Sequence, residues 1–286
     1  MSATPQTNRA SGYPQALGQA ELLEFIELAD KLTGIQLDVS KESLLFTRLS
    51  RRLRALKMPT FDLYLALLKS GDPAEVEEFV NVVTTNLTYF FREPHHFKAL
   101  ADSVLPDLQA SKSRHGVLRI WSSACSSGEE PYSIAMTLAE SGLVAGSDYR
   151  ILCTDLNTEM VELTRRGDFL ARDARGLDEA RKSRFFAEDT GGVLKVNQEL
   201  RDAMICKSLN LFNDWPIRSG VDIIFCRNVL IYFNAQQHTE IVLKFAKVQA
   251  AGAYLFLGHS ETVHHVGQYY ERVGNTVFKR TARQVD

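Results

Sequence analysis

Short apolar segments that alternate with helical patterns after residue 117 restrict the fold of this chain more than any other feature of its sequence. Strands that are apolar along their whole length are typical of parallel sheets covered on both faces. Helical patterns cover 131–140, 156–165 and 235–248. The alternation predicts an open α/β sheet, with a final hairpin around Gly274-Asn275. The predicted parallel strands are VLRIWSSA (117–124), YRILCTD (149–155), MICKSLNL (204–211), DIIFCRN (222–228) and AYLFLGH (253–259).

Residues 168–203 interrupt this alternation. Within them, FFAEDTGGVLKV (185–196) has a Gly-Gly turn between two short apolar runs. This pattern predicts a small antiparallel β-subdomain inserted in the α/β domain.

The chain before this region has a helical period instead. Apolar residues recur at steps of three and four between Glu21 and Val83, which predicts helices that include 41–57, 62–68 and 74–83. Ser40 is the expected N-cap of the helix over 41–57. The first residues are small and polar and predict a disordered tail. We expect a tail (1–16), an all-helical domain with its linker (17–92) and an α/β domain (93–286, with the β-subdomain at about 168–203).

Charge and hydropathy exclude several classes of function. The 286 residues carry 33 Lys and Arg against 35 Asp and Glu, a net charge of −2. Domains that grip nucleic acid over a wide surface carry a strong basic excess, so we expect no nucleic-acid partner. The sequence has no charged-then-apolar leader and no run that approaches the ~18 apolar residues of a membrane span. We expect a cytoplasmic protein without direct membrane insertion.

The cysteines and histidines predict neither a disulfide framework nor a metal site. The cysteines lack the Cys-x-x-Cys spacing and lie in or beside apolar runs, so we expect reduced, buried thiols. The pairs His95-His96 and His264-His265 are adjacent in the chain, and adjacent residues rarely ligate one metal. The four cysteines are Cys125, Cys153, Cys206 and Cys226.

Ligands of open α/β sheets bind outside the carboxyl ends of the strands, so the residues there are the candidates for a site. The loop after the first strand has small residues that allow a close backbone approach, but its single Gly128 makes a poor dinucleotide fingerprint. Glu129 and Glu130 follow at a helix N-terminus, where a phosphate site would need bare amides. The loop therefore favours a cationic or amine-bearing ligand over a pyrophosphate.

Polar residues follow the next three strands. Asp155 could accept hydrogen bonds from ribose hydroxyls, or it could be an ordinary helix N-cap. Asn210-Leu211 and Asn228-Val229 offer amides that could hold an adenine edge or an amino acid, although asparagine also closes turns. Together these residues outline a site for a nucleoside joined to an amino acid, which fits S-adenosylmethionine better than NAD or ATP.

The segment from Asn86 to Glu93 (NLTYFFRE) has two interpretations. In the first, its aromatic residues form a core turn with Arg92 on the surface. In the second, Arg92 closes over the ligand and binds a carboxylate through its planar guanidinium.

These segments closely resemble the CheR family of chemotaxis receptor methyltransferases, in the family's order and spacing over roughly residues 20–280. The matching pieces are NLTYFFRE (86–93), WS…SGEEPYS (121–133), Thr154-Asp155, Asn210-Leu211, FCRNVLIYF (225–233) and GHSE (258–261).

The resemblance implies a helical N-terminal domain and a Rossmann-like domain that uses S-adenosylmethionine and releases S-adenosylhomocysteine. Either Glu129 or Glu130 would be a ligand, and the spacing to Asp155 favours Glu130. Arg92 and Tyr232 would flank the reacting centre. The residues implied to line the cofactor pocket are Asn86, Thr88, Arg92, Glu130, Asp155, Asn210, Leu211, Asn228 and Val229.

The resemblance also implies a substrate. Family members methylate glutamate side chains on the cytoplasmic helices of chemoreceptors, giving glutamate methyl esters for chemotactic adaptation. Members that dock on a receptor's C-terminal tether have a longer loop in the β-subdomain than the compact 188–192 of this chain. We therefore expect no docking on a tether.

The predicted helix over 41–57 carries six basic residues against Glu42 alone. Such a face is often merely solvated, but the resemblance makes an acidic receptor helix its expected partner. Opposite charges attract across such an interface, and salt screens the attraction. The residues expected to bind the substrate are Arg48, Arg51, Arg52 and Arg54.

Two other functions compete with this interpretation. A nucleic-acid methyltransferase would carry an Asn/Asp-Pro-Pro-aromatic or a Pro-Cys motif, and neither occurs in the sequence. A non-catalytic module that senses S-adenosylmethionine would need the same pocket, so the sequence leaves this alternative open.

Overall fold

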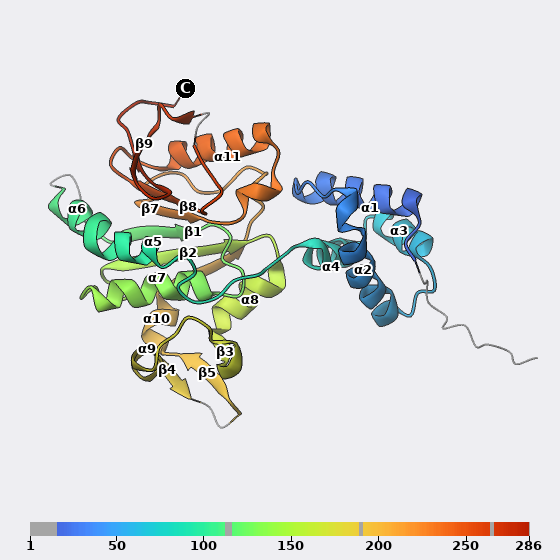
Figure 1. Ribbon diagram of the computed structural model, residues 1–286, viewed down its shortest axis with the longest axis horizontal. Helices are drawn as coiled ribbons and strands as arrows, with labels where there is room; N and C mark the ends of the chain where they lie inside the picture. The colour runs from blue at the N-terminus through green and yellow to red at the C-terminus, as the bar shows by residue number, and fades with distance from the viewer. Residues whose placement is uncertain (1–15, 112–115, 189–190, 264–265, 286) are drawn as a thin grey trace, which may run out of the picture. The chain divides into compact units, whose positions relative to one another are not determined.

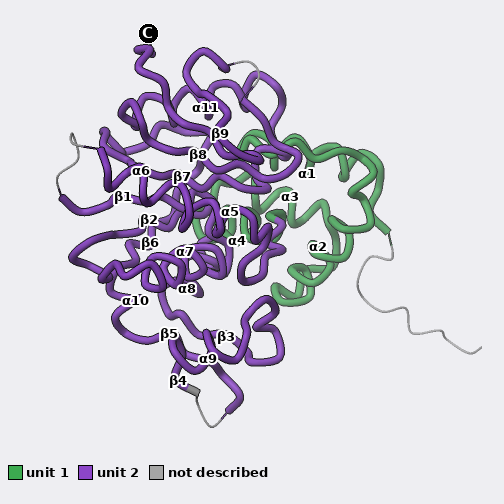
Figure 2. Tube along the Cα trace, turned by 60° about the vertical axis from the view of Figure 1, so that its left-hand side comes forward, with its two compact units in different colours: residues 1–84 green, residues 85–286 purple. Residues whose placement is uncertain are grey.

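The computed structural model of the chain describes residues 16–111, 116–188, 191–263 and 266–285. It divides the chain into two compact units, Met1–Thr84 and Thr85–Asp286 (Figure 2). The division lies before the boundary expected after Arg92, because the segment that ends at Arg92 makes its contacts with the second unit. Residues 1–15 of the expected tail lie outside the described part of the chain.

The described part of unit 1 (Met1–Thr84) has only helices as its regular elements, as predicted. The helices are α1 (Gln19–Thr33), α2 (Glu42–Leu56), α3 (Phe61–Lys69) and α4 (Pro73–Val83) (Figure 1). The apolar stripe of each helix faces one core, in which Phe25 stacks on Phe79 and Leu49 and Leu53 are fully buried. Thr60 and Asp72 cap α3 and α4 through their side chains.

The predicted N-cap at Ser40 is wrong. Residues Val39–Lys41 form a 3-10 turn in which the Asp38 side chain accepts a hydrogen bond from the Ser40 backbone N–H. Helix α2 begins at Glu42, one residue later than predicted, and the side chain of its N-cap Lys41 makes no capping bond. Asp38 competes for the same exposed backbone N–H groups, and the sequence pattern does not tell which polar side chain wins.

Unit 2 (Thr85–Asp286) contains a seven-stranded sheet with the order β6-β2-β1-β7-β8-β10-β9. The first five strands in this order are parallel, and β10 pairs antiparallel with β8 and with β9. The chain runs outward from β1 through β2 to β6 and then returns to β7 on the other side of β1. This reversal places a ligand crevice outside the carboxyl ends of β1 and β7. The strands are β1 (Leu118–Ser122), β2 (Tyr149–Asp155), β6 (Met204–Ser208), β7 (Ile223–Cys226), β8 (Tyr254–Leu257), β9 (Tyr270–Gly274) and β10 (Val277–Arg280).

Both faces of this sheet are buried at its centre, which explains why β7 and β8 are apolar throughout. In β7, Ile223 and Phe225 face the core that α7 (Glu129–Glu140) covers, whereas Ile224 and Cys226 face the core under α11 (Ala235–Val248). Figure 1 shows α11 on one side of the sheet and α7 on the other. All four cysteines are free and buried, as expected.

A helical segment that the sequence analysis did not predict precedes β1. It runs through α5 (His95–Ala99), a π-helical turn (Leu100–Val104) and α6 (Leu105–Ala110). Pro94 and Pro106 obscure its period, because each proline suggests a boundary in a sequence. Its apolar side chains join the same core as α7.

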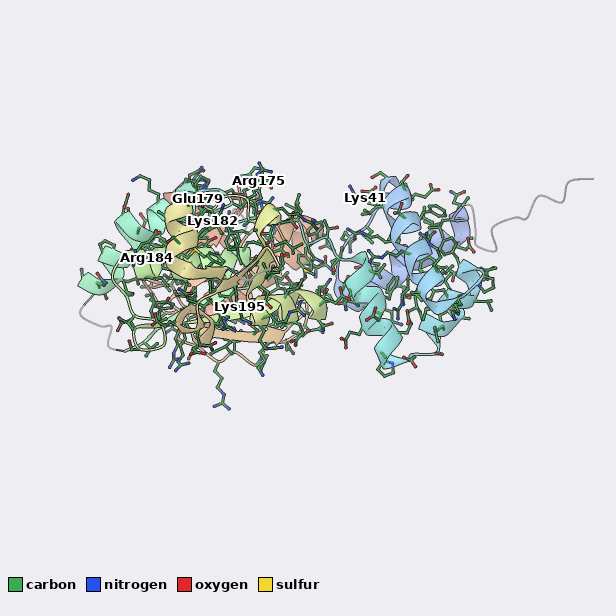
Figure 3. The ribbon with its side chains drawn as sticks, turned by 90° about the horizontal axis from the view of Figure 1, so that it is seen from below. Lys41, Arg175, Glu179, Lys182, Arg184 and Lys195 are labelled. Carbon is green, nitrogen blue, oxygen red and sulfur yellow. The ribbon has the colours of Figure 1, made fainter. Side chains whose placement is uncertain are left out.

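The β-subdomain is antiparallel, as predicted, with the strand order β3-β5-β4. Its strands are β3 (Asp168–Leu170), β4 (Phe186–Glu188) and β5 (Val193–Val196), and the short helices α9 (Glu179–Phe185) and α10 (Gln198–Asp202) flank them. Figure 3 shows that its outer side chains mix charges, because Glu179 lies among the basic residues and pairs with Lys182 at 2.7 Å. The loop 188–192, on which the expectation about a tether depends, includes residues 189–190 outside the described part.

Candidate functional site

The loop after β1 is held in place by the end of β2. The Asp155 carboxylate accepts hydrogen bonds from the backbone N–H groups of Ser126 at 2.8 Å and of Asn157 at 2.9 Å. Asn157, and not Asp155, is the N-cap of α8 (Thr158–Arg166). Burial raises the pKa of the Asp155 carboxyl, and its backbone donors oppose this shift. Each carboxylate oxygen can accept a second hydrogen bond, so the carboxylate could still bind a hydroxyl.

The two glutamates at the start of α7 have different surroundings. Glu130 is buried, and its carboxylate accepts hydrogen bonds from the Ser122 hydroxyl at 2.7 Å and from Arg227 at 3.0 Å. Glu129 is half-buried and accepts a hydrogen bond from the Ser127 hydroxyl at 2.6 Å. Burial raises the pKa of both carboxyls. Both side chains therefore remain near the loop, and Glu130 is the one that an arginine neutralises.

The segment 86–93 packs against this loop and the β-subdomain. The Ser126 hydroxyl donates to the Asn86 carbonyl at 2.9 Å, and the Phe91 backbone N–H donates to the Ser133 hydroxyl at 2.9 Å. Phe90 is buried, and its ring lies 4.8 Å from that of Phe169. Phe90 and Phe91 are therefore part of the core, as the first interpretation of this segment states.

Arg92 and Thr88 are half-buried at the edge of that core. The Arg92 guanidinium donates to the Leu87 carbonyl at 2.8 Å, which curls the side chain back over its own segment. A guanidinium has five N–H donors, so others remain for a carboxylate ligand.

The segments after β6 and β7 contain the other expected residues. The Asn210 side chain accepts a hydrogen bond from the Phe212 backbone N–H at 2.9 Å, which closes a turn, and Leu211 is buried. Asn228 has a left-handed backbone with φ 58°. Its side-chain amide donates to Glu93 at 3.2 Å. Tyr232 is half-buried in the 3-10 turn Leu230–Tyr232.

Two buried charged residues, to which the sequence analysis assigned no role, join these segments. Arg227 donates to Glu130 and to the Arg92 carbonyl, and it lies 3.6 Å from Glu93. Glu261 is buried and accepts four backbone hydrogen bonds. Arg227 directly precedes Asn228 in FCRN, and Glu261 ends GHSE. A charged residue beside a buried strand end was the signal that could have revealed both.

The expected substrate-binding arginines of α2 fall into two pairs. Arg48 donates to the carbonyls of residues 82–84 at 2.7–3.1 Å, and Arg52 forms an ion pair with Glu75 at 2.6 Å. Arg51 and Arg54 have exposed side chains. The first pair contributes to the fold of unit 1, which leaves the second pair better placed to meet a partner.

One group of side chains among the described residues has the composition of a metal site. Ligand atoms of Glu93, His95 and His96 lie within 4.8 Å of one another. However, the Arg227 guanidinium lies 3.6 Å from the Glu93 carboxylate, and a fixed cation there opposes a second one. We therefore interpret the group as part of the Arg227 ion-pair network.

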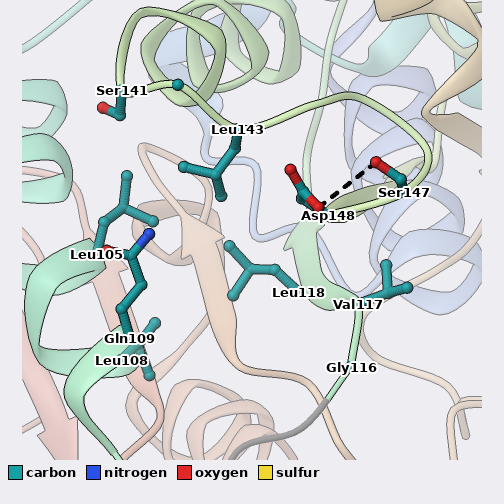
Figure 4. A pocket seen from close by; sticks show the side chains of 11 residues that line it. Leu105, Leu108, Gln109, Gly116, Val117, Leu118, Ser141, Leu143, Ser147 and Asp148 are labelled. Carbon is teal, nitrogen blue, oxygen red and sulfur yellow. Dashed lines mark hydrogen bonds between the residues drawn. The ribbon is translucent and has the colours of Figure 1, made fainter.

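A pocket of about 480 Å³ lies at the opposite edge of the sheet (Figure 4). Leu118, which begins β1, and Asp148, which precedes β2, contribute to its wall. The candidate residues lie instead at the carboxyl ends of the same strands. The pocket is thus separate from the candidate site.

Comparisons with known proteins agree with this division of the chain. The family model described as "CheR methyltransferase, all-alpha domain" matches residues 20–84, and "CheR methyltransferase, SAM binding domain" matches residues 86–279. Among curated proteins, the chain is 41% identical over 252 residues to chemotaxis protein methyltransferase 2 of Pseudomonas aeruginosa, covering 87% of this chain and 88% of that one. It is 37% identical to the chemotaxis protein methyltransferase of Salmonella typhimurium and 38% identical to that of Escherichia coli, each over 92% of this chain and 91% of the relative.

Proposed function

We propose, from the premise that this chain belongs to the CheR family of chemotaxis methyltransferases, that it methylates glutamate side chains on the cytoplasmic helices of chemoreceptors. Its second unit is a methyltransferase domain that uses S-adenosylmethionine. The products of the proposed reaction are a glutamate methyl ester and S-adenosylhomocysteine. The reaction would take place in the cytoplasm, where the acceptor helices lie.

The single observation that supports an acidic acceptor is the charge of α2. Arg51 and Arg54 have exposed side chains on a helix that buries Leu45, Leu49 and Leu53 in the core of unit 1. Lys41, just before the helix, is also exposed (Figure 3). An acidic helix is the partner that such a surface attracts.

The candidate site fits the methyl donor by its chemistry. Glu129, Glu130 and Asp155 place acidic groups near a loop of small residues, which suits a ligand with a sulfonium and an amino group and disfavours a pyrophosphate. Bound there, S-adenosylmethionine supplies an electrophilic methyl group. The residues that would hold it are Asn86, Thr88, Arg92, Glu130, Asp155, Asn210, Leu211, Asn228 and Val229.

The proposed chemistry needs no strong base. An unperturbed glutamate titrates near ~4.3, so its carboxylate is already a nucleophile at neutral pH. The oxygen–carbon bond forms as the carbon–sulfur bond breaks, and both opposite charges are neutralised. The protein has to align the carboxylate with the methyl group and exclude water. We assign Arg92 to the orientation of a carboxylate and Tyr232 to the wall of the reacting centre.

Transfer of a labelled methyl group tests this function. The purified protein is incubated with labelled S-adenosylmethionine and a panel of receptor cytoplasmic fragments, and the labelled fragments are treated with mild base. We expect volatile methanol, because methyl esters hydrolyse whereas N-methyl and C-methyl products do not. Fragments in which the acceptor glutamates are replaced by alanine are the control. Base-stable label would contradict ester formation, and binding of S-adenosylhomocysteine without any transfer would favour the sensing module.

A further inference from the structure

The segment GHSE (258–261) follows β8 and ends in a glutamate whose carboxylate is fully occupied. Glu261 accepts hydrogen bonds from the backbone N–H groups of Gly258 at 2.6 Å, Asn228 at 3.0 Å, Val229 at 2.8 Å and Leu230 at 2.7 Å. A carboxylate has about four acceptor sites. All of them are used inside the protein, so Glu261 has none left for a ligand.

These bonds fix an unusual backbone after β7. Asn228 has a φ of 58°, a conformation that residues with a Cβ rarely adopt. The three successive N–H groups of residues 228–230 point at one carboxylate. Such a turn of N–H groups is an anion-binding concavity, and here the anion is the protein's own side chain.

The Asn228 side chain is held from the opposite direction. Its amide donates to Glu93 at 3.2 Å, and the exposed His259 ring lies 3.2 Å from the same Glu93 oxygen. Gly258 leaves the space for this arrangement, since a Cβ on it would lie 2.6 Å from the Asn228 amide nitrogen and 2.8 Å from the Asn228 backbone nitrogen. Three chain segments therefore meet at Asn228.

We propose that Glu261 is a positioning residue for methyl transfer, because its carboxylate holds Asn228 and Val229 in the conformation that presents them to the methyl donor. The inference rests on the proposed place of Asn228 and Val229 in the cofactor pocket. Glu261 acts through the backbone and touches neither donor nor acceptor. Gly258 contributes to the same arrangement around Asn228, because its lack of a side chain allows the Asn228 amide to lie beside Glu93.

Glu261→Gln tests the proposal. The glutamine oxygen can accept from two N–H groups, but its NH₂ group then faces the other two donors. We expect the affinity for S-adenosylhomocysteine, measured by calorimetric titration, to fall about 10- to 100-fold, since a small misplacement of binding groups can cost that much. The KM for S-adenosylmethionine should rise while kcat changes less. Glu261→Asp keeps the charge and should restore part of the affinity.

Gly258→Ala tests the same arrangement around Asn228 and leaves the buried charge of Glu261 unchanged. The added methyl group should displace the Asn228 amide and raise the KM for S-adenosylmethionine. Gly191→Ala is its matched control, because a Cβ there meets no atom within 4 Å. Should Glu261→Gln fail to fold, Gly258→Ala decides the question alone.

A purely structural role predicts a different result. Gln249 is a buried polar side chain at the other edge of the sheet, where it donates to the Tyr254 carbonyl at 2.7 Å and accepts from the Tyr270 hydroxyl at 2.7 Å. Gln249→Ala should lower the unfolding temperature and leave the affinity for S-adenosylhomocysteine unchanged. Wild-type affinity in Glu261→Gln or Gly258→Ala, or an equal loss in Gln249→Ala, would overturn the proposal. A wild-type protein that binds S-adenosylhomocysteine but transfers no methyl group would contradict the proposed function instead.

Discussion

Arg92 forms hydrogen bonds with two parts of the candidate site, one through its guanidinium and one through its backbone carbonyl. Its guanidinium donates to the Leu87 carbonyl at 2.8 Å, and its own carbonyl accepts a hydrogen bond from the buried Arg227. The backbone at Arg92 is thus fixed by Arg227, whereas its side chain contacts neutral partners, the Leu87 carbonyl and the Tyr89 ring, whose centroid is 6.0 Å away. A carboxylate would compete well for that side chain, because charge-assisted bonds are stronger than neutral ones.

Arg92→Ala should therefore lose turnover without losing the fold. We expect kcat for methyl transfer to fall about 100-fold or more, because Arg92 is proposed to orient a reacting carboxylate. Circular dichroism should show an unchanged unfolding temperature to within a few degrees. Arg150→Ala is the matched control, since Arg150 is exposed on β2. Near-wild-type turnover in Arg92→Ala would remove this residue from the mechanism.

His96 is a second residue whose surroundings decide its behaviour. The ring is fully buried, and its Nε2 atom lies 2.8 Å from the Thr276 hydroxyl. Burial is the largest of the causes that lower the pKa of His96 from 6.5 to about 3; the Arg227 guanidinium and His95 act in the same direction, and Glu93 opposes them. The folded protein therefore keeps this ring neutral at every pH near neutrality.

The stability of unit 2 should consequently fall between pH 6.5 and pH 5. Over this range the unfolded chain binds a proton at His96 that the folded chain does not, which lowers the free energy of unfolding by up to ~1.4 kcal/mol per pH unit. Urea unfolding at pH 7 and pH 5 measures the loss, and His96→Gln should show a smaller one. Trp121 and Trp215, the two tryptophans of the chain, both lie in unit 2 and report its unfolding by fluorescence. An identical pH dependence in His96→Gln would contradict the assigned pKa shift.

At the scale of elements, α2 has two functions on different sides. Leu45, Leu49 and Leu53 pack in the core of unit 1, and Arg52, 21% exposed, pairs with the buried Glu75 and also with Glu78 at 3.0 Å. Arg48 binds the last carbonyls of α4 and the residue after it. The positive charge that the sequence analysis assigned to one surface is therefore divided between folding and the exposed face.

Charge reversals should separate the two functions of α2. Arg51→Glu and Arg54→Glu should slow the methylation of receptor fragments at low salt, and the difference from wild type should shrink as salt screens the attraction. Unfolding of unit 1 should stay unchanged in both. Lys31→Glu, an exposed reversal on α1, is the control. Unchanged rates at low salt for both reversals would exclude α2 as the docking surface.

Arg52→Met should instead lower the free energy of unfolding of unit 1 by about 2–3 kcal/mol, because it leaves Glu75 buried without its partner.

At the scale of the whole molecule, the described residues form separate cores. The core of unit 1 contains residues of the four N-terminal helices together with Leu17, which precedes α1, and two cores lie on the two faces of the sheet in unit 2. Of the described helices, none is long and apolar enough to span a bilayer. Each unit thus buries its own apolar residues, which is the condition for independent folding.

The two units should therefore respond differently to ligand. Saturation with S-adenosylhomocysteine at about 100 times its Kd should stabilise unit 2 by about 2.7 kcal/mol, because the ligand binds only the folded state. Tryptophan fluorescence should report this shift during thermal unfolding. Circular dichroism should show a second, ligand-independent transition from the helices of unit 1. A single transition that shifts as a whole would show that the units unfold together.

Most elements follow from local patterns in the sequence. The helix predicted over 235–248 and the strand predicted over 149–155 have the same bounds as α11 and β2. Their signals are strong because α11 buries one side, which gives a helical period, and most of β2 is buried, which gives a nearly continuous apolar run. The helical segment 95–110 was missed because two prolines and a π-helical turn disturb its period. Short elements such as α9 and α10 have too few residues to show a period.

The site shows where this local information ends. The order of small, acidic and amide residues at the strand ends is present in the sequence, and with the family resemblance it identified the methyl donor. The partners of those residues come from segments far apart in the chain, as when Arg227 joins Glu130 to the Arg92 carbonyl. The hydrophobic period of an element indicates which of its residues are buried. It does not indicate which charged residue from a distant part of the chain will contact them.

The sequence by itself therefore determined the two-part architecture and the parallel sheet, because these depend on apolar periods and strand order, and it predicted a ligand site at the carboxyl ends of the strands. Only the tertiary structure decided which charges are available to partners. It committed Arg48 and Arg52 to the fold of unit 1 and left Arg51 and Arg54 exposed. It also assigned Glu261 to four backbone N–H groups. The physical reason is that a buried charge must find its counterpart in space, and the fold sets which groups come within reach.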